Sequence, residues 1–249
     1  MYIMSYLVLN SIQRSRFLDR SRPIRFSKLR KITLLAVKYC VNFIIKEAVA
    51  RLETVFPVSY KSSYSFADND YYTRSGGSAV LCTMADCIGA VNLARAISPQ
   101  NPPIFIVTAL YYCCQLSAES LFDGYNSTDE VVKLSNADLR LCGDASQRLL
   151  EANHHVKSVF VDMQDRAEES RHREHAFKRL VQALIRDKSF VYPEPLDSCE
   201  SFLSKHRAEV DELCSRCTDR LKAELDDARH ETFNELGDFF GIVPWPSYD

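Results

Sequence analysis

Apolar side chains follow a helical pattern through most of the second half of the chain. In residues 144–188 they follow a seven-residue repeat, at Leu149, Val156, Phe160, Met163, Ala167, Phe177, Val181 and Leu184. Residues 197–238 carry a second such pattern, at Val210, Leu213, Cys217, Leu221, Leu225, Ala228 and Leu236. The segment Tyr192-Pro193-Glu194-Pro195 between them predicts a turn. Together they predict a long antiparallel αα-hairpin and a short C-terminal tail over residues 143–249.

The first of these two predicted helices has a weak point. Ser170 and Glu174 occupy apolar positions of the repeat inside the charged block 165–175. The helix is predicted to continue through this block, although its apolar pattern is weakest there. The second helix is expected to end near Gly237 or Gly241, because glycine commonly terminates helices.

Residues 78–97 and 102–120 form a second predicted pair of helices. The first is rich in small residues and the second is apolar nearly all round, which is typical of buried helices. We expect burial at Val80, Leu81, Met84, Ile88, Val91, Ile104, Val107, Leu110 and Tyr111. A hairpin embedded in a membrane is the alternative. Asp86, Asn92 and Arg95 disfavour it, because such groups are costly in lipid unless they are paired.

The remaining pattern completes a mainly α fold. Residues 28–51 predict an apolar helix, with Leu29, Ile32, Ala36, Cys40 and Phe43 at helical spacings. Residues 53–77 are rich in tyrosine and polar residues and predict a linker-like loop. The chain has only 7 glycines in 249 residues, which disfavours folds built from many tight turns. We therefore predict an N-terminal helical domain over residues 32–142, followed by the hairpin.

Charge is distributed unevenly along the chain. Residues 1–51 hold 11 Lys or Arg against Asp19 and Glu47, a net of +9, so the remaining residues carry −11. The basic segment 1–31 is arginine-rich and serine-rich with almost no acids, which is typical of an organellar transit peptide. A folded basic segment that contacts the acidic body is the equally weighted alternative. A transit peptide would be removed; if the segment persists, we predict that an anionic partner binds Arg14, Arg16, Arg20, Arg22, Arg25, Lys28 and Arg30.

Three histidines follow a carboxylate by three residues, which places both side chains on one helix face. The pairs are Glu151/His154, Glu169/His172 and Asp227/His230. Di-iron proteins use such pairs in helical bundles. The flanking positions here are charged, however, so solvent-facing pairs are favoured.

Two further motifs approach known sites without matching them. Cys214-x-x-Cys217 precedes His230 at nearly a zinc-finger spacing, but the second histidine is missing, so core packing is favoured over zinc or redox chemistry. Ser75-Gly76-Gly77-Ser78 lacks the lysine of a phosphate-binding loop, so a linker with a helix cap is favoured. We accordingly predict no metal ion, no cofactor and no catalytic residue.

The nine cysteines have no disulfide-framework spacing, which favours buried thiols in a reducing, intracellular compartment. A long charged hairpin buries little surface of its own, so we expect it to bind other protein subunits. The first hypothesis is therefore a non-enzymatic structural or assembly subunit of a larger complex, in the mitochondrion if the transit peptide is real. The alternatives are a nucleic-acid-associated protein that uses the basic arm, although a whole-chain pI near 6.3 disfavours it, and a helical-bundle metalloenzyme.

Overall fold

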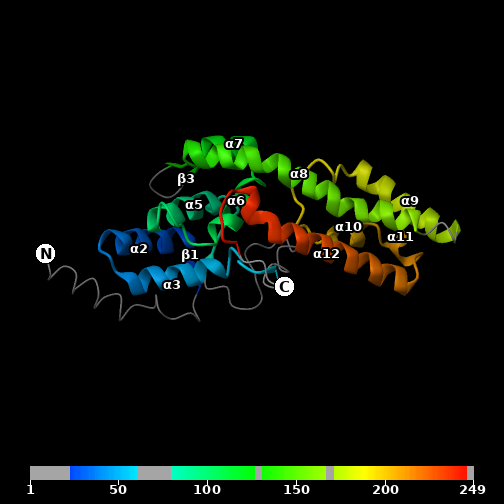
Figure 1. Ribbon diagram of the computed structural model, residues 1–249, viewed down its shortest axis with the longest axis horizontal. Helices are drawn as coiled ribbons and strands as arrows, with labels where there is room; N and C mark the ends of the chain where they lie inside the picture. The colour runs from blue at the N-terminus through cyan, green and yellow to red at the C-terminus, as the bar shows by residue number, and fades with distance from the viewer. Residues whose placement is uncertain (1–22, 61–79, 127–130, 167–170, 246–249) are drawn as a thin grey trace. The chain divides into compact units, whose positions relative to one another are not determined.

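The computed structural model of the protein describes residues 23–60, 80–126, 131–166 and 171–245 (Figure 1). Within these ranges the chain forms ten helices and two short strand ladders, which confirms the predicted mainly α fold. Contacts divide the chain into two compact units, and the division falls between Arg140 and Leu141, inside a helix. The residues before the division are called the N-terminal unit, and those after it the hairpin unit.

The N-terminal unit consists of five helices and two small ladders. Its elements are β1 (Ile24–Arg25), α2 (Phe26–Lys38), α3 (Asn42–Glu53), β2 (Val80–Leu81), α5 (Asp86–Ile97), α6 (Ile106–Cys113), α7 (Ala118–Asp123), β3 (Tyr125–Asn126) and β4 (Val131–Val132). β1 pairs with β2 in parallel, with Ile24 opposite Val80. β3 and β4 are antiparallel, with Tyr125 opposite Val132. The ladders are two residues long, too short for a periodic signal in the sequence.

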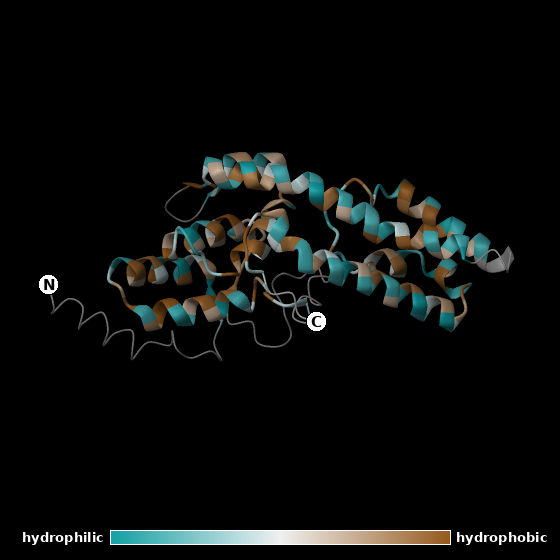
Figure 2. Cartoon of the chain, viewed as in Figure 1, coloured by the Kyte–Doolittle hydropathy of each residue, from teal (hydrophilic) through white to brown (hydrophobic). Residues whose placement is uncertain are grey.

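The core of this unit lies where α5 packs against α2 and α6. Every residue of α6 is buried, as expected for a helix that is apolar on all sides (Figure 2). A glycine lets α5 approach its neighbours closely: a Cβ at Gly89 would lie 2.7 Å from the Phe26 ring and 2.9 Å from the Tyr125 hydroxyl. A substitution of Gly89 by alanine would therefore force the side chains of Phe26 and Tyr125 to move away from α5.

The helix predicted over residues 28–51 is in fact two helices. α2 ends in a Schellman motif, in which Cys40 has a φ of +56°. The Val41 N–H donates to the Ala36 carbonyl (2.8 Å) and the Cys40 N–H donates to the Val37 carbonyl (3.2 Å). The chain reverses there and α3 begins at Asn42. Cys40 and Phe43, which the single-helix interpretation places on the apolar face, are consequently exposed.

The predicted helices 78–97 and 102–120 are also shorter than expected. α5 begins only at Asp86, whose carboxylate accepts hydrogen bonds from the Thr83 N–H (2.7 Å) and hydroxyl (3.0 Å). Leu81 lies in β2 and Met84 in the turn before α5, so both are exposed and their predicted burial is wrong. Ile104 is half-buried, and the other expected core residues are buried. A turn after Cys113 separates α6 from α7.

The three polar residues that disfavoured a membrane hairpin all have partners within this unit. Asp86 accepts a hydrogen bond from the Tyr125 hydroxyl (3.2 Å), and Asn92 donates to the Lys133 carbonyl (2.8 Å). Arg95 forms an ion pair with buried Asp138 (2.9 Å). Across the described ranges, no helix combines the length and the apolar character that a membrane crossing requires.

The hairpin unit is built on two long helices. Its elements are α8 (Asn136–Asp165), α9 (Arg171–Arg186), α10 (Glu200–Lys205), α11 (Arg207–Asp211) and α12 (Ser215–Phe239). Side-chain contacts join α8 to α12 at Arg148–Asp238, His155–Glu231 and Arg166–Glu224. Residue numbers rise along one helix as they fall along the other, so the two helices pack antiparallel, as predicted.

Apolar residues of both arms form one core cluster. From the predicted positions it includes Val156, Phe160, Met163, Phe177, Leu184, Leu213, Leu221, Leu225 and Ala228, with Val181, Val210 and Cys217 packed against it. Figure 2 shows α8 and α12 alternating between polar and apolar residues along their length. The burial of these positions follows directly from their helical spacing.

The arms are interrupted more often than the sequence predicts. α8 begins at Asn136 rather than Asp144, because the Ser135 hydroxyl accepts a hydrogen bond from the Asp138 N–H (3.1 Å) and caps the helix. The first arm, predicted as one helix, breaks after Asp165, within the charged block where its apolar pattern is weakest. The second arm divides into α10, α11 and α12, with breaks at His206 and at residues 212–214.

The C-terminal segment folds back onto α12. Gly241, with a φ of +63°, ends the helix in a Schellman motif, and the Ile242 N–H donates to the Gly237 carbonyl (2.8 Å). The Trp245 indole N–H donates to the Phe233 carbonyl (2.8 Å), and the two rings lie 5.2 Å apart. A Cβ at Gly237 would lie only 2.2 Å from Trp245 Cβ, so this glycine is required for the contact.

Candidate functional site

The outward side of α2 and the start of α3 combine cations with large apolar side chains. We define the α2–α3 face as the exposed residues Arg25, Lys28, Lys31, Leu35, Lys38, Tyr39, Phe43 and Lys46. Successive members along α2 are separated by three or four positions, which places them along one side of the helix. The opposite side carries Phe26, Leu29 and Ala36 into the core of the unit.

The apolar members of this face are unusually exposed for their size. Leu35 is 52% exposed, Tyr39 is 54% exposed and Phe43 is 41% exposed. Leu35 and Tyr39 are four positions apart at the end of α2, and Phe43 follows the Schellman turn at Cys40 at the start of α3. Lys38 Nζ is 5.7 Å from the Tyr39 ring centroid, a cation–π distance. The face therefore combines exposed apolar and aromatic side chains with cations.

The cations of this face are largely uncompensated. Arg25, Lys28, Lys38 and Lys46 form no ion pair with any residue that the structure describes. Of the two carboxylates on α3, Glu47 pairs with buried Arg51 (2.9 Å). The other, Glu53, is half-buried, and burial raises its pKa above the ordinary value of 4.5. The positive charge on this face is therefore available to an anionic group.

The seven predicted anion-binding residues fall into three groups. Arg14, Arg16, Arg20 and Arg22 lie outside the described residues. Arg25 and Lys28 are exposed members of the α2–α3 face. The third group is Arg30 alone, which is half-buried rather than exposed.

Arg30 lies near Tyr125 in the interior of the unit. Burial and the Asp86 carboxylate raise the pKa of the Tyr125 hydroxyl, and the positive charge of Arg30 partly offsets this rise. Arg30 therefore contributes to the charge balance around Asp86 instead of facing outward with Lys28. Lys31 and Lys38 on α2 and Lys46 on α3 are exposed instead, and the helical spacing of Lys31 and Lys38 from Lys28 was the available signal.

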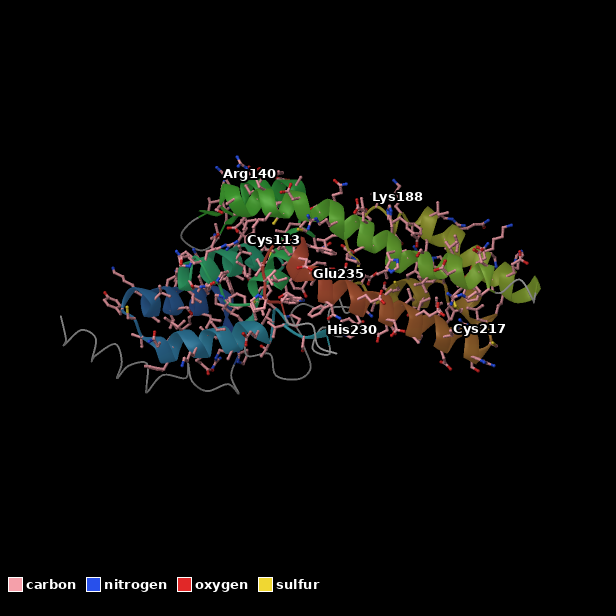
Figure 3. All side chains as sticks on the ribbon, viewed as in Figure 1. Cys113, Arg140, Lys188, Cys217, His230 and Glu235 are labelled. Atoms are coloured by element: carbon pink, nitrogen blue, oxygen red, sulfur yellow. The ribbon has the colours of Figure 1, made fainter. Side chains whose placement is uncertain are left out.

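The histidine pairs occupy different surroundings. His154 is exposed, and its Nε2 lies 2.9 Å from the Phe190 carbonyl. Glu151 instead lines an open groove of about 440 Å³ between α8 and α12, together with Arg148, Ala152, His155, Glu231, Thr232, Glu235 and Phe239. In this groove His155, rather than His154, approaches a carboxylate, at 3.7 Å from Glu231. Figure 3 labels Glu235 and His230 on α12.

Metal-binding geometry is not found in the described parts of the chain, where no group of three His, Cys, Asp or Glu side chains could hold an ion. Glu169 lies outside these parts. His230 is half-buried and Asp227 is exposed, both on α12.

A buried polar network holds the connection between the two arms. The fully buried Asn153 donates to the carbonyls of Ser189 and Tyr192, both at 2.9 Å. Lys157, 3% exposed, places its Nζ 2.8 Å from Cys199 Sγ and 3.6 Å from Asp197. Burial raises the pKa of the Cys199 thiol, although the charge of Lys157 acts in the opposite direction. These polar groups have a structural role, because each contacts the segment that reverses the chain.

The cysteines divide by exposure. Cys82, Cys87, Cys113, Cys114, Cys142 and Cys199 are buried, as expected for most of the nine. Cys87 and Cys113 place their sulfur atoms 3.4 Å apart inside the N-terminal unit. Cys40 and Cys214 are exposed, and Cys217 is half-buried. Figure 3 shows Cys217 near the beginning of α12.

Comparison of the chain with models of protein families, with curated protein sequences and with solved structures finds no match.

Proposed function

We propose that the protein is a non-enzymatic structural or assembly subunit of a larger protein complex. In this proposal the α2–α3 face binds an acidic surface of a partner protein. The observation that carries it is that Lys28, Lys38 and Lys46, which form no ion pair with a described residue, occur on α2 and α3 together with exposed Leu35, Tyr39 and Phe43. Protein interfaces are commonly enriched in aromatic and apolar residues bordered by polar ones, and the α2–α3 face contains residues of both kinds.

A protein partner fits this face better than nucleic acid does. Binding to a phosphate backbone depends mainly on the number of cations and gains little from exposed Leu or Phe side chains. The residues after position 51 carry a net charge of −11, which would repel a polyanion from most of the molecule. Association with nucleic acid therefore remains the alternative, and the metalloenzyme proposal has less support than either.

The hairpin offers a second contact surface for other subunits. Ile185 and Val191 are 64% and 63% exposed and flank the end of α9, and Tyr192 beside them is 55% exposed. Apolar residues at the end of an arm are suited to a subunit contact.

The mitochondrial version of the proposal depends on the basic segment 1–31. An import assay on the full chain, with and without this segment, would test it.

Charge reversal with a matched control tests the proposed partner. One variant carries Lys28→Glu, Lys38→Glu and Lys46→Glu. The control carries Arg140→Glu, Lys178→Glu and Lys222→Glu, three exposed cations elsewhere that also make no ion pair among the described residues. The full chain would be purified from the cells that produce it, and the stoichiometry of each copurifying protein would be measured by mass spectrometry.

We expect the first variant to lose a stoichiometric acidic partner that the control retains. A third variant, with Leu35→Ser, Tyr39→Ser and Phe43→Ser, should lose the same partner, while Phe122→Ser, at a residue 62% exposed, should not. Loss of bound RNA or DNA in place of a protein would support the alternative. Equal partner recovery from all variants would contradict the proposal.

A further inference from the structure

Two cysteines occupy the first turn of α12 with their thiols in contact. Cys214 is the N-cap residue of this 25-residue helix and Cys217 lies within its first turn. Their sulfur atoms are 3.0 Å apart. A disulfide bond is about 2.05 Å long, so the sulfur atoms need to approach by only about 1 Å to form one. Cys214 is exposed and Cys217 is half-buried, so solvent and solutes reach the first sulfur more easily.

The surroundings of Cys214 favour its thiolate, which is the reactive form of cysteine. The Cys217 N–H points toward Cys214 Sγ at 3.4 Å, and a helix N-terminus stabilises nearby negative charge. Arg216, between the two cysteines, is exposed and forms no ion pair among the described residues. The neighbouring acids Asp211 and Glu212 already pair with Arg207 and Arg179, while Asp219 is exposed one turn further along.

We propose that Cys214 and Cys217 form a thiol–disulfide exchange site that takes a small-molecule disulfide as its substrate. In the first step the Cys214 thiolate attacks one sulfur of the substrate disulfide. A mixed disulfide forms on Cys214, and the other half of the substrate leaves as a thiolate. In the second step Cys217 loses its proton and attacks Cys214 Sγ. The protein disulfide forms, and the second half of the substrate leaves as a thiol. The protein is oxidised by two electrons and the substrate is reduced to two thiols.

The remaining cysteines differ from this pair in access or in geometry. Cys87 and Cys113 are close enough to interact, but both are fully buried in the core of the N-terminal unit. Cys40 is exposed, at the turn that ends α2, and no other sulfur is placed near it by any described contact. Cys40 can therefore form a mixed disulfide but not close an internal one, which makes it a natural control.

Oxidation at this site would act on the core of the hairpin. Cys217 packs against the apolar cluster that contains Leu213 and Leu221. A bond between Cys214 and Cys217 would fix the corner where α11 meets α12. The site thus links the redox state of the surroundings to the start of a long helix of the hairpin.

The test uses the reduced full-length protein and oxidised glutathione as the probe. After incubation over a range of probe concentrations, the remaining thiols are alkylated and the products are mapped by mass spectrometry of proteolytic peptides. We expect the wild-type peptide that spans both cysteines to lose two hydrogens and to gain no alkyl group. The Cys217→Ser variant should accumulate glutathione on Cys214, and Cys214→Ser should react much more slowly at Cys217.

Cys40→Ser, as the control, should leave the internal disulfide unchanged. The proposal would be overturned if Cys40 acquires glutathione while wild-type Cys214 and Cys217 remain reduced. It would also be overturned if both single variants acquire glutathione at the same rate. The mass of the wild-type peptide tests the proposal even if a serine variant fails to fold. Far-UV circular dichroism would show whether the two serine variants keep their helices.

Discussion

The hairpin and the α2–α3 face differ in how many of their charged residues form ion pairs. On the hairpin, Arg166 and Arg220 both reach Glu224, Arg179 reaches Glu212, and Lys205 reaches Asp187. Its interior also contains polar side chains, chiefly Asn153 and Lys157, that contact the arm connection. On the α2–α3 face the exposed cations point outward beside exposed apolar groups. Several hairpin cations are thus paired within their own unit, whereas Lys28, Lys38 and Lys46 form no ion pair with a described residue. The face is therefore suited to a partner that supplies negative charge.

The largest expected effect concerns the polar interior of the hairpin. Asn153→Ala leaves the carbonyls of Ser189 and Tyr192 without their donor, so we expect a loss of about 2 kcal/mol in the free energy of unfolding. Urea denaturation followed by circular dichroism would measure it. Gln147→Ala, at an exposed position of the same helix, should change little. Equal stability of both variants would mean that the network does not hold the connection.

The next largest change in stability should come from helix-end substitutions, and it should be similar in the two units. Cys40 and Lys188 each occupy the left-handed position of a Schellman motif, with φ of +56°, where glycine is the usual residue. Cys40→Gly and Lys188→Gly should each therefore raise the free energy of unfolding, by about 1 kcal/mol. Denaturant titrations of the two variants would show it. If one glycine variant is more stable than wild type and the other less stable, side-chain contacts outweigh backbone strain at the position that loses stability.

A smaller effect tests the charge comparison directly. A double-mutant cycle of Arg166→Ala and Glu224→Ala should give a coupling energy of at most about 1 kcal/mol, because this pair is partly exposed. Lys28→Ala, at a cation without a partner among the described residues, should leave stability unchanged. Stability loss at Lys28 as large as at Arg166 would remove the distinction between the two surfaces.

The smallest effect should depend on pH. Burial raises the folded-state pKa of Glu53 above 4.5, so the folded protein binds this proton more tightly than the unfolded chain. The resulting stabilisation is fully present below about pH 4.5 and is lost as the pH rises through the folded-state pKa. Glu53→Gln should therefore stabilise the protein slightly at pH 7 relative to wild type. Denaturation at pH 7 and pH 4 would reveal the trend, and a pH-independent difference would contradict it.

Helical periodicity predicted the hairpin core well, because spacing alone determines which side of a long helix faces its partner. Phe160, Leu221 and Leu225 are buried for this reason. The ends of helices were less predictable. Gly241 is visible in the sequence as a helix terminator, but Cys40 and Lys188 adopt the same backbone conformation without glycine.

Tertiary partners limited the prediction of the candidate site. Lys28 and Arg30 are two positions apart in one basic run, yet only Lys28 faces outward. The difference depends on Asp86 and Tyr125, which the fold brings near Arg30 from distant parts of the sequence. Helical spacing separates residues two positions apart by about 200°, but the side of α2 that faces the core is set by the fold. The lysine spacing along α2 became interpretable only once the end of the helix at Lys38 was known.

The docking of Trp245 gives the hairpin its own optical signal. Trp245 is the single tryptophan of the chain, whereas tyrosines occur in both units. Its indole is fixed against Phe233 of α12, so selective excitation of tryptophan reports on the hairpin unit alone. A shift of its emission during denaturation, compared with the helical signal of the whole chain, would show whether the two units unfold together or one after the other.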